Sequence, residues 1–167
     1  MTFAHYDGRC YSQLEYSAYV YASGIQIRRV IVHHTAVPTV ESWRGERTMR
    51  AMKRVYEGRG WTCGPHVFCA PDGIWVMAPL APHSFNRGAG WESVEDVNVE
   101  IVGNYMAGFP VFPTLDNALS CIATLLRQSP WRFGALCKHR DFAVTSCPGD
   151  ELVKRWDEFC LMIIGRR

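Results

Sequence analysis

Three short segments of this sequence carry side chains that can bind a metal ion. His33 and His34 end a β-branched run, His139 lies in a Lys-His-Arg-Asp segment, and Cys147 directly precedes Pro-Gly. Imidazole and thiolate are favoured ligands of zinc, and a catalytic zinc keeps three protein ligands and one open position for water or substrate. Two histidines and one cysteine from these segments would supply such a set.

The same residues also have a purely structural explanation. A histidine at the end of a strand is often a hydrogen-bonded structural residue, and a cysteine before Pro-Gly is often a buried thiol at the start of a helix. His33 is far from His139 and Cys147 along the chain. Only the fold can bring the three together, so spacing alone leaves both explanations open.

Two strands are predicted to position these residues. Residues 25–34 form a β-branched run whose apolar side chains occupy both faces, which is typical of a central strand covered on both sides. Residues 97–102 alternate: Val97, Val99 and Ile101 face one side, whereas Asn98, Glu100 and Val102 face the other.

The remaining pattern indicates an α/β protein. A hairpin is predicted over 66–70 and 74–78, because Ala-Pro-Asp-Gly between these apolar runs favours a turn. Apolar residues at helical spacing predict helices over 41–57, 115–128 and 151–164. Strands that mingle with helices predict a single domain with a central mixed β-sheet flanked by helices.

The chain is expected to divide into an N-terminal arm and one larger domain. Residues 1–24 are rich in tyrosine but show no clean period, so we interpret them as an arm packed on a domain that spans residues 25–167. The predicted helix over 41–57 carries a basic face. A solvated surface is the simpler explanation of that face, and contact with an anionic polymer is the alternative. The basic residues are Arg44, Arg47, Arg50, Lys53 and Arg54.

Composition excludes several classes of protein. The 167 residues are 48% hydrophobic and 20% charged, which is typical of a globular protein and too apolar for a disordered one. A net charge of +2 gives no case for a nucleic-acid partner. No apolar run is long enough for a membrane span, and no signal-peptide pattern is visible, so a cytoplasmic protein is expected. Seven cysteines without a CxxC pair indicate reduced thiols.

Four ordered motifs cover about residues 25–160 of the chain. They are Val30-Ile31-Val32-His33-His34-Thr35-Ala36, Gly64-Pro65-His66-Val67-Phe68 with Asp72-Gly73, Val97-Asn98-Val99-Glu100-Ile101-Val102-Gly103, and His139-Arg140-Asp141 through Cys147-Pro148-Gly149-Asp150. In their order and intervals these motifs resemble those of the type 2 N-acetylmuramoyl-L-alanine amidases, a superfamily that includes phage lysozymes of the amidase type, muropeptide amidases and peptidoglycan recognition proteins.

The resemblance implies a zinc site made by His33, His139 and Cys147. One departure stands out, because many members carry a catalytic Tyr where this chain has Pro65. The muropeptide amidases also lack that Tyr and have a Glu as the base at the place of Glu100. We therefore favour Glu100 as the general base; its alternative role is a solvent-facing strand carboxylate.

Other residues are implied less directly. Thr145 matches the family position near the oxyanion, and it could equally cap the loop or the following helix. His83 and Asn86 fall where relatives line the substrate cleft, and Trp61 is a candidate wall for a sugar or peptide. His34, on the opposite side of its strand from His33, and His66 complete the candidate substrate-binding set, although a core role for His66 is the simpler one.

The implied reaction is zinc-dependent hydrolysis of the amide between N-acetylmuramic acid and L-alanine in peptidoglycan or muropeptides. An endolysin that a holin releases from the cytoplasm and a muropeptide-recycling enzyme both fit this reaction. The main alternative is a non-catalytic peptidoglycan-binding module. A zinc hydrolase with another substrate and a protein whose His and Cys are structural are further alternatives. Nothing in the sequence indicates an oligomer, so a monomer is the default.

Overall fold

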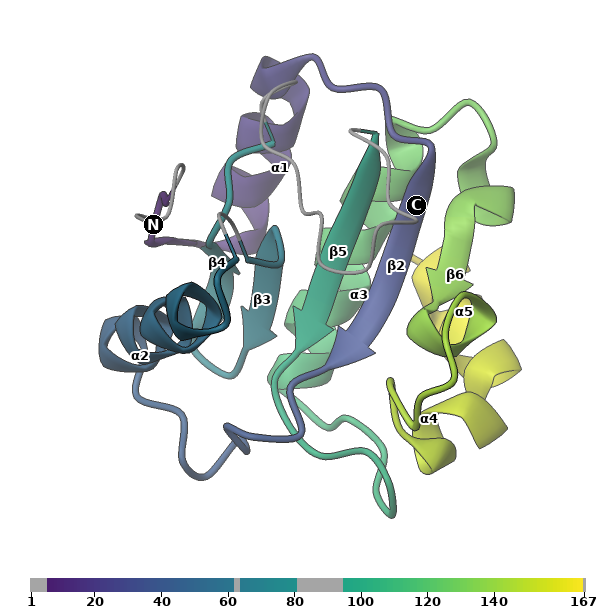
Figure 1. Cartoon of the computed structure of the whole chain (residues 1–167). Helices are drawn as coiled ribbons and strands as arrows, with labels where there is room; N and C mark the ends of the chain where they lie inside the picture. Colours follow the sequence, from purple (N-terminus) through teal and green to yellow (C-terminus); the bar gives the residue numbers. More distant parts are fainter. Residues whose placement is uncertain (1–5, 62–63, 81–94, 167) are drawn as a thin grey trace.

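The computed structural model describes residues 6–61, 64–80 and 95–166, and within these ranges it contains one mixed six-stranded sheet (Figure 1). The strand order is β1-β4-β3-β5-β2-β6. The neighbours β3–β5, β5–β2 and β2–β6 are parallel, whereas β1–β4 and β4–β3 are antiparallel. The strands are β1 (Arg9–Tyr11), β2 (Arg29–His34), β3 (Val67–Ala70), β4 (Gly73–Val76), β5 (Asp96–Ile101) and β6 (Leu136–Lys138). The predicted α/β class with a mixed sheet is confirmed.

Helices cover both faces of the sheet, but unequally. They are α1 (Gln13–Ser23), α2 (Glu46–Gly58), α3 (Thr114–Arg127), α4 (Asp150–Lys154) and α5 (Trp156–Ile164), with short 3₁₀ turns η1 (Arg132–Ala135) and η2 (His139–Asp141). The larger core lies under α1, α3 and α5, where it takes the alternate residues Val97, Val99 and Ile101 of β5. A second core packs α2 against β3 and β4 through Met49, Phe68 and Trp75.

The face that carries α2 leaves part of the sheet for polar residues. In Figure 1, α2 lies over the β3–β4 side, beside β5 and β2. The alternation of β5 directs Asn98 and Glu100 to this face, and both are buried. The register pairs His33 with Glu100 and Ile31 with Asn98. Three polar side chains therefore meet where the two central strands run side by side.

Most predicted elements are confirmed, with shifts at their ends. The hairpin, the strand of residues 97–102 and the helices over 41–57 and 115–128 correspond to β3–β4, β5, α2 and α3. The strand expected over residues 25–34 begins only at Arg29. The single helix expected over residues 151–164 is two helices, because the backbone leaves helical geometry at Arg155.

The stretch that we interpreted as an arm contains two regular elements. β1 is an edge strand paired with β4, and α1 packs Tyr16 and Val20 into the larger core. The Tyr19 hydroxyl accepts a hydrogen bond of 2.9 Å from the Leu80 backbone N–H. This segment thus contributes directly to the sheet and to the core.

In the described part of the chain, no helix combines the length and the apolar character that a membrane crossing requires. The six cysteines of this part carry free thiols, with Cys69 and Cys121 buried in the larger core. Cys63 lies outside the described residues.

Candidate metal centre

Two neighbouring parallel strands bring the predicted metal ligands together. β2 ends with His33 and His34, and β6 leads directly into His139. The register pairs Val32 with Lys138, so the next residues, His33 and His139, come side by side. Cys147 comes from the loop before α4. One donor atom from each of His33, His139 and Cys147 lies within 4.8 Å of the other two. The His33 and His139 ring centroids are 4.5 Å apart.

The orientation of His33 is set by Asn98. Its Nε2 lies 2.7 Å from the Asn98 Oδ1, and its Nδ1 lies 3.7 Å from the Cys147 Sγ. If Nε2–H donates to the amide oxygen, Nδ1 keeps a lone pair directed at the cluster. Burial, and then the neighbouring His139, lower the pKa of His33 to about 3. The imidazole is therefore neutral at physiological pH, which is the form that binds a metal.

Cys147 is a half-buried thiol that a divalent cation would convert to a thiolate. Burial, and then the nearby Glu100 carboxylate, raise the pKa of the Cys147 thiol to about 12 in the metal-free protein. The His34 backbone N–H donates to its sulfur at 3.4 Å. Burial disfavours the thiolate, whereas a bound cation stabilises it, so a thiol that coordinates a metal is deprotonated. Two neutral imidazoles and one such sulfur match the ligand preference of zinc.

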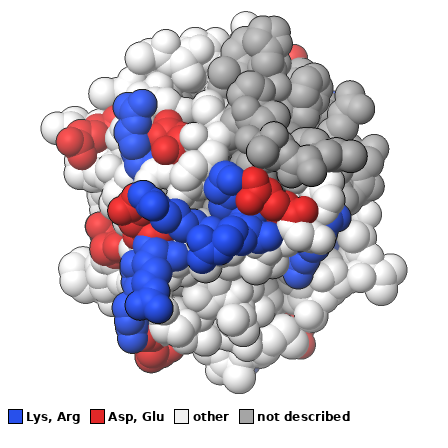
Figure 2. All heavy atoms as spheres, turned by 60° about the vertical axis from the view of Figure 1, so that its left-hand side comes forward, with Lys and Arg blue, Asp and Glu red and all other residues white. Residues whose placement is uncertain are grey.

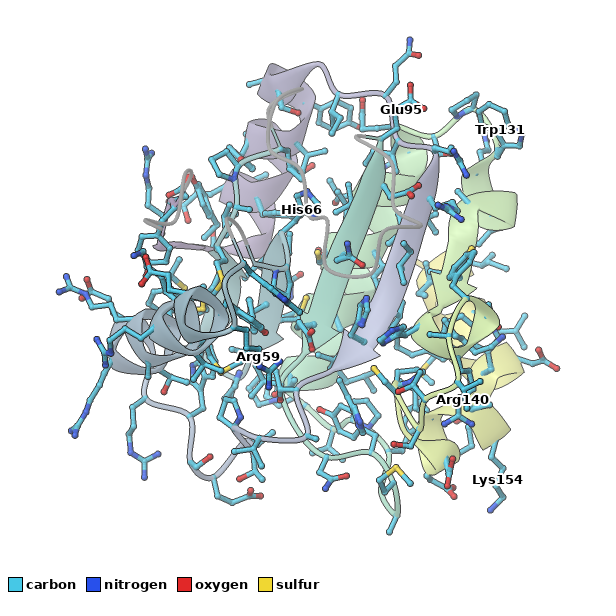
Figure 3. All side chains as sticks on the ribbon, in the orientation of Figure 1. Arg59, His66, Glu95, Trp131, Arg140 and Lys154 are labelled. Atoms are coloured by element: carbon cyan, nitrogen blue, oxygen red, sulfur yellow. The ribbon has the colours of Figure 1, made fainter. Side chains whose placement is uncertain are left out.

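Arg140 holds the ligand loop in place. Its Nε donates to the Cys147 carbonyl at 3.3 Å, and its guanidinium also bonds the Ser146 carbonyl and the Asp150 carboxylate, the latter at 2.9 Å. Arg140 directly follows His139, so one side chain ties the η2 turn to the loop of Cys147. Figure 3 places it on the α4 side of the ends of β5 and β2, opposite Arg59 at the end of α2.

Glu100 is a buried carboxyl group beside this cluster. Its side chain is only 8% exposed, and Oε2 has no hydrogen-bond partner among the described residues. Burial raises the pKa of Glu100 to about 8. A carboxyl group with a pKa near neutrality can both accept and release a proton at physiological pH.

The cluster forms the floor of a cleft of about 760 Å³. α2 forms one wall through residues such as Met52 and Val55. Tyr56 stacks on Trp61 in the same wall, with ring centroids 5.1 Å apart and planes 5° apart. Donors, a carboxyl group and an aromatic platform thus share one cavity of the size that ligand sites occupy.

The other residues singled out from the sequence have different surroundings. Thr145 lines the cleft, and its Oγ1 accepts the Cys147 N–H at 3.1 Å, so it also caps the loop. His34 lines the cleft, while its Nδ1 accepts the Tyr105 N–H at 3.1 Å. His66 is buried and accepts the Asn98 backbone N–H at 3.1 Å. His83 and Asn86 lie outside the described residues.

Sequence reasoning missed the two residues that hold the ligands. Asn98 was noted only as a member of the alternating strand, and Arg140 only as part of a motif. The available signal for Asn98 was a pair of polar residues, Asn98 and Glu100, on one face of an otherwise apolar strand. No comparable signal existed for Arg140, because two of its three partners are main-chain carbonyls.

Comparison with known proteins found a curated relative of this chain, although no protein-family model matches it. The human N-acetylmuramoyl-L-alanine amidase is 33% identical over 169 residues, which cover 81% of this chain and 25% of that protein. The chain therefore spans about a quarter of the length of this curated relative.

Solved structures share the fold. Drosophila PGRP-LB has a TM-score of 0.63 at 24% identity, over 77% of this chain and 78% of that chain. The catalytic domain of XlyA has a TM-score of 0.64 at 20% identity, over 96% of this chain and 92% of that chain. The human relative and the ordered motifs support the superfamily of type 2 N-acetylmuramoyl-L-alanine amidases and peptidoglycan recognition proteins for this chain, and the solved structures share its fold.

Proposed function

We propose that the protein is a zinc-dependent N-acetylmuramoyl-L-alanine amidase, which hydrolyses the amide between the lactyl group of N-acetylmuramic acid and L-alanine. One observation carries the proposal: the donor atoms of His33, His139 and Cys147 gather within 4.8 Å on the floor of a cleft, next to the buried Glu100. A structural role for the three ligands would not require an open cavity above them.

The relatives support this choice of substrate class. The human relative is itself an N-acetylmuramoyl-L-alanine amidase. A mutant of Drosophila PGRP-LB has a structure in complex with tracheal cytotoxin, which is a monomeric peptidoglycan of the diaminopimelic acid type. We therefore assign peptidoglycan or its soluble muropeptide fragments as the partner of this chain, with a monomer as the active form.

The three ligand residues would bind the metal, and Glu100 would transfer protons. A zinc ion bound by His33, His139 and Cys147 would polarise the scissile carbonyl and lower the pKa of a water molecule towards 7. Glu100 would take the proton from the attacking water and deliver it to the departing alanine nitrogen, acting first as general base and then as general acid. Thr145 accepts a hydrogen bond at its Oγ1, so its hydroxyl hydrogen can be donated to the developing oxyanion.

The walls of the cleft would bind the substrate. Trp61, already stacked on Tyr56, offers an aromatic surface for a sugar face or a peptide side chain. His34 would contact substrate from the end of β2, and we propose His83 and Asn86 as further substrate contacts. His66, which the sequence also placed in the substrate-binding set, is buried and would instead support the cleft through its hydrogen bond to the Asn98 backbone.

A second candidate function is peptidoglycan recognition without cleavage. The observation that favours it is Pro65 in the wall of the cleft, at the position where many relatives carry a catalytic Tyr. Proline cannot donate a hydrogen bond, so under this reading the cleft would hold a muropeptide without cutting it. Such a binder would sediment with cell walls and release no new amino termini.

Product analysis tests the proposal directly. The purified protein is incubated with a soluble muramoyl peptide, and the products are identified by mass spectrometry. We expect two products: a muramic acid with a free lactyl carboxylate, and a peptide that begins with L-alanine. Cleavage at any other bond would refute the amidase assignment, and intact substrate with bound zinc would favour the recognition module.

The biological setting is part of the same proposal. The six described cysteines carry free thiols, which fits folding in a reducing compartment. We infer a protein that acts from the cytoplasm, either as a bacteriolytic endolysin that reaches the wall through a holin or as a muropeptide amidase.

A further inference from the structure

The positive charge of this protein is concentrated on α2 and on the residues that flank its two ends. Residues 44–59 contain six basic and two acidic side chains, a net charge of +4, whereas the whole chain carries +2, so the remaining residues carry −2. We call the six basic residues the α2 basic face. They are Arg44, Arg47, Arg50, Lys53, Arg54 and Arg59.

The basic residues of α2 lie on its outer side. Met49 and Tyr56 point into the core beneath the helix, whereas Arg47, Arg50 and Arg54, at i, i+3 and i+7, are exposed. Figure 2, which looks towards the side of the molecule that carries α2, shows basic side chains gathered in a band with acidic side chains mainly at its edges.

Only part of this charge is neutralised within the protein. Arg50 pairs with Glu46 at 2.5 Å and Lys53 pairs with Glu57 at 2.6 Å, each one helical turn away. Arg47, Arg54 and Arg59 form no ion pair with any of the described residues. Like charges at this spacing repel each other, so the face has capacity for an external anion.

The α2 basic face borders the candidate active site. The adjacent side of the same helix, including Thr48, Ala51 and Val55, lines the cleft, and so does Arg59. Arg59 also lies over the Trp61 ring, with its guanidinium carbon 5.7 Å from the ring centroid. The basic residues therefore lie next to the rim of the cleft, on the outer side of the helix that forms its wall.

We propose that the α2 basic face binds polyanionic polymer of the bacterial wall and holds the wall against the cleft. The choice of the wall, rather than a nucleic acid, rests on the proposed function. Because the proposed function already places the stem peptide in the cleft, the occupant we assign to the outer face is a phosphate-bearing polymer of the wall. Binding through exposed charges is screened by salt, because the Debye length falls to about 3 Å at 1 M ionic strength.

The test compares two variants with the same loss of charge. Arg47→Gln/Arg54→Gln removes two unpaired cations of the face, and Arg9→Gln/Lys154→Gln removes two exposed cations elsewhere, each with a side chain 75% exposed. Zinc-loaded proteins are mixed on ice with excess insoluble walls, and the unbound fraction is measured after brief centrifugation at increasing sodium chloride. Circular dichroism and the thermal midpoint establish that both variants are folded.

We expect the face variant to bind about 10-fold more weakly than wild type at low salt and to converge with it at high salt. The control variant should bind like wild type. Walls stripped of phosphate polymers test the assigned occupant: the salt-sensitive binding should be lost, and its persistence would overturn the assignment to phosphate.

Three other results would overturn the proposal. The face variant could bind like wild type, the two variants could lose affinity equally, or variant-sensitive binding to a DNA duplex could exceed binding to walls at equal anionic charge. Release of amino groups, measured in parallel, separates the proposed wall binding from the proposed amidase activity. Binding through the face without any release would reject the hydrolase and leave the face assigned.

Discussion

At the scale of single residues, two side chains on one face of β5 have different tasks. Asn98 contacts His33, a proposed zinc ligand. Glu100 is paired with His33 in the strand register, and one of its oxygens makes no hydrogen bond among the described residues. Both are buried, so each can be replaced by a side chain of similar size without exposing new surface. Their substitutions separate metal binding from proton transfer.

Glu100→Gln should remove proton transfer and leave zinc binding intact. The amide has nearly the same shape, but it cannot accept a proton from water, so we expect the turnover of a soluble muramoyl peptide to fall by about 10² to 10⁴. Turnover and zinc content are measured on the same preparation. Glu158→Gln, an exposed change on α5, is the matched control. Near-normal turnover of a zinc-loaded Glu100→Gln protein would show that another group is the base.

Asn98→Ala should weaken zinc binding by about 10- to 100-fold, because the residue that orients a ligand histidine is lost. Asn98→Asp keeps an oxygen acceptor at the same place and should restore most of the affinity. A competition titration against a chromophoric chelator measures both, and the absorption spectrum of the cobalt-substituted protein reports the ligand geometry. Equal affinities for Ala, Asp and wild type would mean that Asn98 does not position His33.

At the scale of elements, the sequence predicted those with a clear hydrophobic period. β5, α3 and the β3–β4 hairpin were found because their patterns match one buried face or one turn. α1 was missed because its apolar residues lie on both sides: Tyr16 and Val20 are buried, whereas Leu14 is 81% and Tyr21 is 55% exposed. A usable signal was present, since Ser12 and Glu15 form a capping box at its start.

Only part of the candidate metal centre could be predicted from the sequence. His33, His139 and Cys147 were named from ordered motifs, because no local spacing relates residues on different elements. β6 is only three residues long and has no period of its own, so the pairing that places His139 beside His33 could not be predicted. Asn98 and Arg140 act through contacts that arise only in the folded chain.

Because α1 packs into the larger core, we expect it to contribute to the stability of the protein. Val20→Ala leaves a cavity in the larger core and should lower the free energy of unfolding by about 2 kcal/mol. Tyr21→Ala changes the next residue, which is largely exposed, and should change the free energy of unfolding by less than about 0.5 kcal/mol. Urea denaturation measures both. Equal small effects would mean that residues 13–23 only rest on the domain.

At the scale of the whole molecule, one polar contact joins elements from both ends of the chain. Asp116 on α3 accepts a hydrogen bond of 2.6 Å from the Gln13 side chain of α1 and pairs with Arg166, which follows α5. The hydrogen bond from Arg166, and then that from Gln13, lower the pKa of Asp116. This carboxylate therefore couples the stability of the assembled fold to pH.

The direction of that coupling follows from the sign of the shift. Because the folded pKa lies below the unfolded value of about 3.9, the contact stabilises the protein above that value and is lost as the pH falls through the folded pKa. We expect the stability advantage of wild type over Asp116→Asn to shrink between about pH 5 and pH 2. Urea denaturation across this range measures it, and a constant difference would refute the assignment.

The central claim is that zinc held by His33, His139 and Cys147 makes this protein an amidase. The most direct measurement follows the appearance of L-alanine amino groups from peptidoglycan with untreated protein, with chelated protein, and after zinc is restored. We expect release that disappears on chelation and returns with zinc. Release that is insensitive to chelation, or no release from a protein that contains zinc, would contradict it.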